Sequence, residues 1–322
     1  MKKLTAGACA LLLAAALLIG YLLFHAWLFL RLPGGSARAW IVVDIPPRMG
    51  AMSVAQLLQE SHLISDAQKF YLLCRYRKAS RRLRAGEYGF AAPATPDQIL
   101  EKLVQGKVLL HRLTIPEGST LWDVAKIVEE QGLASAQEIV RLAQDPQFMQ
   151  SLGITGPNLE GYLFPETYQL PKTQDPQSML RTMVQQFRQQ FPESWVKRSE
   201  ELGMRVQDVV TLASIVEKEA VVDGERPRIA SVFHNRLKKN MPLQSDPTSV
   251  YDLPGFSGPV TSGHLKRQSP YNTYLIKGLP IGPICNPGRK SLEAALYPEA
   301  TNFLYFVSNM DGTHQFSATI TE

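Results

Sequence analysis

The stretch TLASIVEKEA, residues 211–220, predicts a helix that is buried on at least one face. Apolar side chains recur at helical spacing, at Val209, Leu212, Ala213 and Val216. Glu217 and Glu219 lie near its end, two positions apart, which places them about 200° apart around a helix. We therefore expect only one of them to line a cleft and the other to be solvated or salt-bridged.

Glu217 is the candidate for chemistry. A carboxyl beside apolar neighbours is poorly hydrated, which raises its pKa toward the range where it can donate a proton at neutral pH. The alternative is that both glutamates are ordinary surface residues. Residues 231–288 favour the first interpretation, because Asn, Gln, Tyr and Thr are dense there between prolines. Amide, hydroxyl and aromatic groups suit a sugar-binding cleft, whereas turn conformation is the better explanation for the prolines themselves.

Seven blocks of sequence carry a family resemblance. They are EGYLFPETY (160–168), LASIVEKEA (212–220), SVFHNRL (231–237), LQSDPTSVY (243–251), SPYNTY (269–274), GLPIGPICNPG (278–288) and FLYFV (303–307). In order and spacing they resemble the MltG/YceG-like family of endolytic murein transglycosylases. The resemblance covers nearly the whole chain and places the family's catalytic glutamate, the first of two in the IVEKE block, on Glu217.

The resemblance implies a reaction at peptidoglycan, in which the β-1,4 bond between N-acetylmuramic acid and N-acetylglucosamine is cleaved without water. Glu217 would protonate the glycosidic oxygen and then, as a carboxylate, remove the proton from the muramoyl C6 hydroxyl. The product is a 1,6-anhydro end, and the implied role is glycan strand termination during cell-wall synthesis. Hydrolytic glycosidases usually need two carboxylates, whereas this mechanism needs one.

The polar blocks also supply candidate substrate-binding residues, which would orient Glu217 and hold the sugars. They are Gln244, Asp246, Tyr271, Asn272, Glu166 and Tyr168. Each has a structural alternative. Asp246 precedes a proline and suits a turn, and Glu166 could cap a loop.

The N-terminus predicts a membrane anchor. Residues 4–30 are almost wholly apolar, with His25 the one strongly polar exception, and such a run can cross a bilayer. Lys2 and Lys3 favour a cytoplasmic N-terminus, so we expect a single-pass protein of the inner membrane with a periplasmic body. A signal peptide ending near residue 39 and a lipoprotein site at Cys9 are weaker alternatives, because the run is long and Cys9 precedes it.

A repeat follows the anchor. When the sequence is aligned with itself at an offset of 70 residues, identical residues match. They are Ile45 with Ile115, Val54 with Val124, Ala55 with Ala125 and Leu63 with Leu133. Each copy is expected to form a strand and two helices, capped at Ser65 and Ser135, and GEYGF (86–90) adds a strand to the first copy. The family resemblance implies a LysM-like β-α-α-β subdomain, although a structural spacer explains the repeat nearly as well.

The predicted fold class is α+β, with an anchor at 1–39, the LysM-like subdomain at 40–108 and a mixed catalytic domain at 109–322. In the catalytic part, helices are expected around 174–191, 213–220 and 227–237, and strands near 162–164 and 303–307.

Other function classes have less support. The six histidines are scattered without H-E-x-x-H, so neither a metal nor a cofactor is expected, and the S-x-x-K match at 194–197 lacks its partner motifs. The net charge of +5 draws on residues 75–84 and accompanies no nucleic-acid motif. The expected partners are glycan strands, the membrane and cell-wall synthases. The runner-up function is a non-catalytic, membrane-anchored glycan-binding protein, which would tolerate the loss of Glu217.

Overall fold

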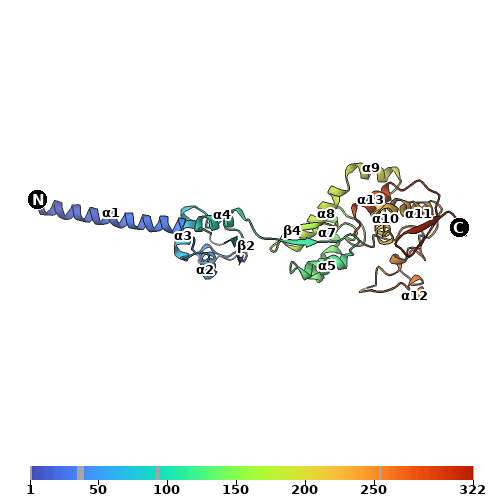
Figure 1. Cartoon of the computed structure of the whole chain (residues 1–322), viewed down its shortest axis with the longest axis horizontal. Helices are drawn as coiled ribbons and strands as arrows, with labels where there is room; N and C mark the ends of the chain where they lie inside the picture. The colour runs from blue at the N-terminus through green and yellow to red at the C-terminus, as the bar shows by residue number, and fades with distance from the viewer. Residues whose placement is uncertain (1, 35–39, 92–93, 254, 322) are drawn as a thin grey trace. The chain divides into compact units, whose positions relative to one another are not determined.

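The computed structural model describes residues 2–34, 40–91, 94–253 and 255–321. The predicted end of the anchor at residue 39 therefore lies outside the described residues. Helices and short strands are mixed along the chain, as the α+β class predicts, and Figure 1 follows them by colour. The chain forms two compact units, residues 1–111 with 171–173 (unit 1) and residues 112–170 with 174–322 (unit 2).

Unit 1 begins with the long helix and continues with two strands and three helices. Its elements are α1 (Lys2–Arg31), β1 (Trp40–Ile45), α2 (Ala51–Glu60), α3 (Ala67–Tyr76), β2 (Gly86–Ala91) and α4 (Pro96–Gln105). β1 and β2 pair antiparallel, from Trp40 opposite Ala91 to Ile45 opposite Gly86. The β-α-α-β order is thus observed, and its LysM-like identity stays a prediction.

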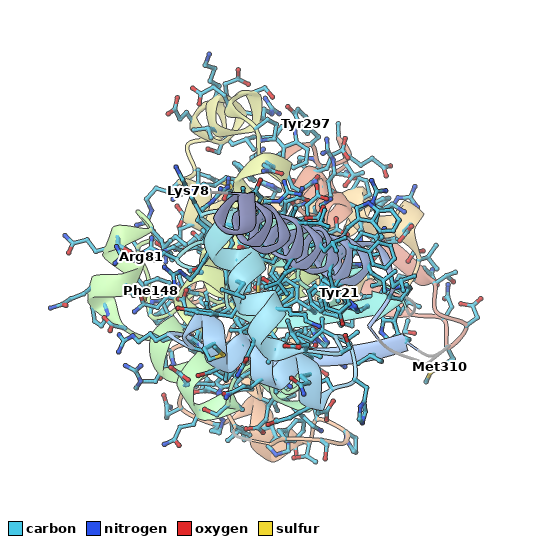
Figure 2. The ribbon with its side chains drawn as sticks, turned by 90° about the vertical axis from the view of Figure 1, so that its left-hand side faces the viewer. Tyr21, Lys78, Arg81, Phe148, Tyr297 and Met310 are labelled. Carbon is cyan, nitrogen blue, oxygen red and sulfur yellow. The ribbon has the colours of Figure 1, made fainter. Side chains whose placement is uncertain are left out.

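Within helix α1, the 20-residue stretch Leu12–Arg31 has a mean hydropathy of 2.1. This stretch is long and apolar enough to span a membrane. Large apolar side chains on this stretch stand exposed, and Tyr21, labelled in Figure 2, is 60% exposed. A signal sequence has the same properties, so retention of the anchor and its orientation stay predictions.

Unit 2 holds the remaining elements. They are β3 (Leu110–Thr114, whose first two residues belong to unit 1), α5 (Leu121–Glu130), α6 (Ala136–Ala143), α7 (Pro146–Ser151), β4 (Thr167–Pro171, whose last residue also belongs to unit 1), α8 (Pro176–Gln190), α9 (Glu193–Glu201), α10 (Val206–Glu219), α11 (Arg226–Lys238), α12 (Ser262–Leu265), α13 (Arg289–Leu296), β5 (Tyr305–Ser308) and β6 (His314–Ser317), with short 3-10 turns at 223–225 and 246–249. β3 pairs with β4, and β5 pairs antiparallel with β6. The helices predicted around 174–191, 213–220 and 227–237 are confirmed as α8, α10 and α11.

The sequence repeat is also a structural repeat, because β3–α5–α6 repeats the order β1–α2–α3. Equivalent positions are buried in both copies, among them Ile45 with Ile115 and Val54 with Val124. Ser135 caps α6 as predicted, since its side chain accepts a hydrogen bond from the Glu138 backbone N–H. The prediction for Ser65 is wrong by one residue: α3 begins later, and Asp66 accepts the bond from the Lys69 backbone N–H.

The strand predicted near 162–164 is also wrong. These residues form a turn, and β4 begins only at Thr167. The apolar side chains are buried as a strand would bury them, but the Leu163 backbone N–H donates to the Asn286 side chain instead of to a neighbouring strand. A short apolar run does not reveal which partner its backbone will find.

Helix α10 lies at the centre of unit 2, packed against α11 and α13, and Figure 1 shows these three helices together. Its eight consecutive residues from Val209 to Val216 are all buried. The helix is therefore surrounded on every side, which is the pattern of a core helix and not of an amphipathic surface helix. Glu217 follows directly after this buried stretch, so a carboxyl is placed where the core meets the surface.

Candidate active site

The carboxyl of Glu217 lies in the last turn of α10 and is held by two donors. Its side chain is only 7% exposed. Oε2 accepts a hydrogen bond of 2.9 Å from the Gly288 backbone N–H, and Oε1 lies 3.3 Å from Arg226 Nη2. A negative charge at a helix C-terminus is unfavourable, because the carbonyl groups there are unpaired. The N–H group and the guanidinium offset that repulsion and fix the direction of the carboxyl.

Arg226 is itself held in place. It begins α11, and its side chain is 7% exposed. Its Nε donates to Ser291 Oγ of α13 at 3.0 Å, and its Nη1 contacts the Asp223 carboxylate, which Lys290 also contacts. Because the planar guanidinium has a rigid donor fork, these contacts set the position of the group that faces Glu217.

A second carboxyl, that of Glu117, lies beside the first one. Glu117 is solvent-accessible and belongs to the loop between β3 and α5. A Cβ atom built on Gly288 would fall 2.0 Å from Glu117 Oε1, so this carboxyl covers the same glycine whose N–H binds Glu217. Partial burial raises the pKa of Glu117, and the charge of Glu217 raises it further, while Arg226 lowers it.

Asn286 joins three of the chain segments around the site. Its Oδ1 accepts from the backbone N–H groups of Gly161 and Leu163, at 2.9 and 3.0 Å. Its Nδ2 donates to the Ser119 carbonyl and to Glu160 Oε1, both at 2.9 Å. One buried amide thus uses both ends of its side chain to fix the loops that carry Glu117 and Gly288.

Glu160 is fully buried beneath these loops. It accepts 2.8 Å hydrogen bonds from the Leu121 backbone N–H and the Tyr251 hydroxyl, in addition to the bond from Asn286. Burial raises its pKa to about 7, although the hydrogen bonds act in the opposite direction. Its position away from solvent makes it a structural carboxyl and not a substrate contact.

Glu219 lies on another face of α10 than Glu217 and is partly exposed, and among the described residues no ion pair is formed with it. It accepts a hydrogen bond of 2.5 Å from Ser245 Oγ. Burial raises its pKa, and the neighbouring charge of Asp246 adds to the effect. The angle of about 200° between positions 217 and 219 correctly predicted that the two glutamates lie on different faces of the helix. The loop that contacts Glu219 carries Ser245, which is distant in sequence.

Four predicted substrate-binding residues lie in two adjacent loops. The Gln244 backbone N–H donates to the Thr273 carbonyl, and Asp246 accepts from the Tyr274 hydroxyl at 2.5 Å. Tyr271 is buried against Tyr251, with ring centroids 4.6 Å apart. Asn272 is fully buried: its Nδ2 donates to the carbonyls of Leu265 and Arg267, and its Oδ1 accepts from the Tyr274 backbone N–H.

The other two, Glu166 and Tyr168, lie at the start of β4. Glu166 is exposed and accepts from the Thr167 backbone N–H, whereas Tyr168 is buried and its hydroxyl donates to the Phe164 carbonyl. Within the described ranges, no hydrogen bond or ion pair joins Glu217 to any of the six predicted residues. The structure brings it together with Glu117, Arg226 and Gly288 instead, and the six substrate-binding roles stay predictions.

The sequence interpretation did not single out these three partners. Glu117 had a usable signal, since it is the one charged residue in the loop PEGS (116–119), between a proline and a glycine. Arg226 and Gly288 had none, because an arginine at a helix start and a glycine after a proline are common for conformational reasons. In the part of the chain that the structure describes, no group of three or more His, Cys, Asp or Glu side chains has the arrangement of a metal site.

Comparisons with known proteins identify the family of the chain. The sequence profile of the YceG-like family matches residues 43–322. This chain belongs to the YceG-like family. The endolytic murein transglycosylase of Bacillus subtilis strain 168 is 32% identical over 304 residues, which cover 89% of this chain and 83% of that protein. The endolytic murein transglycosylase of Streptococcus pneumoniae strain D39 is 27% identical over 85% of this chain and 55% of its own length.

A solved structure shows the same architecture. The crystal structure of a yceG-like protein from Listeria monocytogenes, at 2.6 Å, superposes with a TM-score of 0.61 and 34% identity, and covers 88% of this YceG-like chain and 97% of that one. Several sequence blocks of this YceG-like chain supply the site, since LASIVEKEA carries Glu217 and GLPIGPICNPG carries Asn286 and Gly288. The block SVFHNRL instead holds the C-terminal hairpin, because Arg236 Nε donates to the Leu304 carbonyl.

Proposed function

We propose that this chain is an endolytic murein transglycosylase that cleaves glycan strands of peptidoglycan. The observation that carries the proposal is the placement of Glu217, a nearly buried carboxyl at the end of a core helix, aimed by the Gly288 N–H and by Arg226. The membership in the YceG-like family and the names of the related proteins support the same activity.

Glu217 acts first as acid and then as base. It donates its proton to the glycosidic oxygen as the bond from that oxygen to the anomeric carbon of N-acetylmuramic acid breaks. The C6 hydroxyl of the same sugar attacks the anomeric carbon and gives its proton to the Glu217 carboxylate. Glu217 ends as it began, no water is consumed, and the strand ends in a 1,6-anhydro sugar. Holding the hydroxyl in place needs only binding geometry, so no carboxylate nucleophile is required.

The Glu217 contacts suit both halves of this cycle. During the first half the carboxyl loses its proton, and the Arg226 guanidinium and the Gly288 N–H stabilise the charge that develops. During the second half the same donors keep the carboxylate aimed at one point. Buried donors that are already in place need no reorganisation as the reaction proceeds.

The proposal includes the setting of the enzyme. Helix α1 anchors the chain in the cytoplasmic membrane, and residues 40–322 lie on the periplasmic side, within reach of new glycan. The reaction terminates strands beside the cell-wall synthases, which are the protein partners. Residues 40–108 form a LysM-like subdomain, and residues 109–322 form the catalytic domain. Gln244, Asp246, Tyr271, Asn272, Glu166 and Tyr168 shape the substrate cleft.

The chemical nature of the new glycan ends tests the proposal. The full-length chain in detergent digests purified peptidoglycan in ¹⁸O-labelled water, and mass spectrometry identifies the new ends. We expect anhydro ends without label and early fragments many disaccharides long. Glu217→Gln should lower the rate about 10²- to 10⁴-fold, with an unchanged circular dichroism spectrum. Glu219→Gln is the matched control and should be much milder, because that side chain faces Ser245.

Three results would contradict the proposal. Labelled reducing ends would make the enzyme a hydrolase. Equal lysis by folded Glu217→Gln and by the unaltered chain would remove Glu217 from the mechanism, and an unaltered chain that binds peptidoglycan without cutting it would be a glycan-binding protein.

A further inference from the structure

A cavity of about 400 Å³ lies beside the end of α10, the helix that carries Glu217. Its wall includes Lys218, which directly follows Glu217, and Trp122, Asp123, Tyr251 and Ile284. All of these residues belong to unit 2. A cavity of this size accommodates a small organic ligand such as a pyranose ring with an acetamido group.

Gly118 connects the cavity to the catalytic carboxyl. Lys218 Nζ donates to the Gly118 carbonyl at 2.9 Å. A Cβ atom built on Gly118 would lie 3.7 Å from Glu217 Cγ, so the glycine that binds the Lys218 side chain lies beside the Glu217 side chain. A ligand that contacts Lys218 in the cavity is therefore connected to the Glu217 side chain through Gly118, which suits a neighbouring sugar of a polymeric substrate.

The aromatic floor of the cavity is rigid. The Trp122 ring lies 5.1 Å from the Tyr251 ring, and the Tyr251 ring lies 4.6 Å from that of Tyr271. Tyr251 and Tyr271 are buried, and the Tyr251 hydroxyl donates to Glu160, whereas Trp122 keeps 37% of its surface exposed. A half-exposed indole on an immobile base offers a flat apolar surface at little entropic cost, which suits the apolar face of a sugar.

Polar groups border this floor. Lys218 uses one of its three N–H donors on Gly118, and the others can donate to hydroxyl, acetamido or carboxylate oxygens. Asp123 Oδ2 accepts from the backbone N–H and the hydroxyl of Thr120, which fixes the carboxylate at the start of α5. An apolar floor with a few fixed polar groups at its edge is the usual composition of a sugar-binding or small-molecule site.

We propose that this cavity, the Trp122 cavity, is a glycan subsite in which an N-acetylated sugar next to the cleaved bond packs on Trp122 and hydrogen-bonds with Lys218 and Asp123. The inference rests on the proposed function for the identity of the strand. It adds the place where the strand is held, and it predicts that affinity for sugar depends on residues that take no part in proton transfer.

The experiment measures binding without turnover. The full-length Glu217→Gln chain in detergent is titrated calorimetrically with the β-1,4-linked tetramer of N-acetylglucosamine. We expect binding, a dissociation constant raised about tenfold by the further change Trp122→Ala, and a value within about threefold of the parent for Trp122→Phe, which keeps a ring. Tyr297→Ala is the matched control, because Tyr297, labelled in Figure 2, is an exposed aromatic of unit 2 that does not line the cavity.

A second variant covers the case that Trp122→Ala does not fold. Val250→Trp fills the cavity from its wall while Trp122 remains, and it should abolish binding of the tetramer. The inference is overturned if the parent does not bind the tetramer, if Trp122→Ala binds as the parent does, or if Val250→Trp binds normally. Because no bond is cut in this assay, its outcome is separate from that of the labelled-water experiment.

Discussion

At the scale of single residues, the site depends on how carboxyl groups are surrounded. Glu217 has a guanidinium and an N–H group, Glu117 has a neighbouring carboxylate, and Glu160 is enclosed completely. These three acidic side chains have similar chemistry in an unfolded chain. The fold makes one a candidate acid and base, one an accessible neighbour and one a buried structural group.

The buried carboxyl of Glu160 predicts a dependence of stability on pH. Its pKa is about 7 in the folded protein against an ordinary value of 4.5, so the folded state keeps a proton that the unfolded state releases. Stability should therefore fall as the pH rises from about 4.5 to about 7, by at most about 3 kcal/mol from this group. The side chain in Glu160→Gln cannot ionise, so the free energy of unfolding of this variant should depend less on pH.

Urea unfolding of the full-length chain at pH 5 and pH 8 measures the effect. The control is Glu166→Gln, an exposed glutamate of the same unit, which should keep the slope of the unaltered protein. A Glu160→Gln slope equal to that of this control would mean that Glu160 does not carry the raised pKa.

At the scale of elements, two loops and one helix end make the site. The loop PEGS (116–119) and the segment 286–288 meet at the end of α10, and Asn286 binds both the first loop and the segment at 160–163. None of these pieces is regular secondary structure apart from α10. The positions of these segments are fixed by a buried hydrogen-bond network and not by the backbone hydrogen bonds of a strand or helix.

Gly288→Ala tests this loop geometry. The backbone of Gly288 has φ −72° and ψ 168°, which alanine adopts without strain, so we expect the fold to persist. The added methyl would occupy the place of the Glu117 carboxyl, because Glu117 Oε1 lies 2.0 Å from it. Displacing that side chain should slow glycan cleavage about 10- to 100-fold, since small misplacements at a reacting centre are costly.

The measurement is the initial rate of peptidoglycan cleavage, together with a thermal unfolding curve. Gly224→Ala is the matched control: it lies in the turn before Arg226, and an added Cβ would meet nothing within 4 Å. If both variants cut at the same rate, the position of Glu117 has no part in the reaction.

At the scale of the whole molecule, the predicted membrane anchor would determine where the enzyme acts. Helix α1 contains the 20-residue apolar stretch with exposed side chains, and Lys2 and Lys3 precede it. A phosphatase that is active only in the periplasm, fused to the C-terminus of the full chain, should be active because the basic end of the helix stays in the cytoplasm.

The same fusion without residues 2–31 serves as the control and should be inactive, because it lacks the export segment. Phosphatase activity confined to that shortened fusion, or a cytoplasmic fluorescent reporter that works at the C-terminus of the full chain, would contradict the topology and the peptidoglycan substrate with it.

Local patterns in the sequence were sufficient for much of this protein. The spacing of apolar residues predicted α8, α10 and α11, the 70-residue shift predicted the repeated strand and helices, and the family blocks pointed to Glu217. The helices and strands depend on residues within a few positions of one another, where helix and strand periods act directly on side-chain burial, whereas Glu217 was assigned by the family resemblance.

The tertiary structure alone decided what surrounds Glu217. Gly288 is 71 positions away from it along the chain, and the Asn286 bond to Ser119 spans 167 positions. The same kind of distant partner turned the expected strand at 162–164 into a turn and covered Glu219 with Ser245. A buried polar group must find a partner, but its own sequence neighbourhood does not specify which one, because that choice is made only when distant segments pack together.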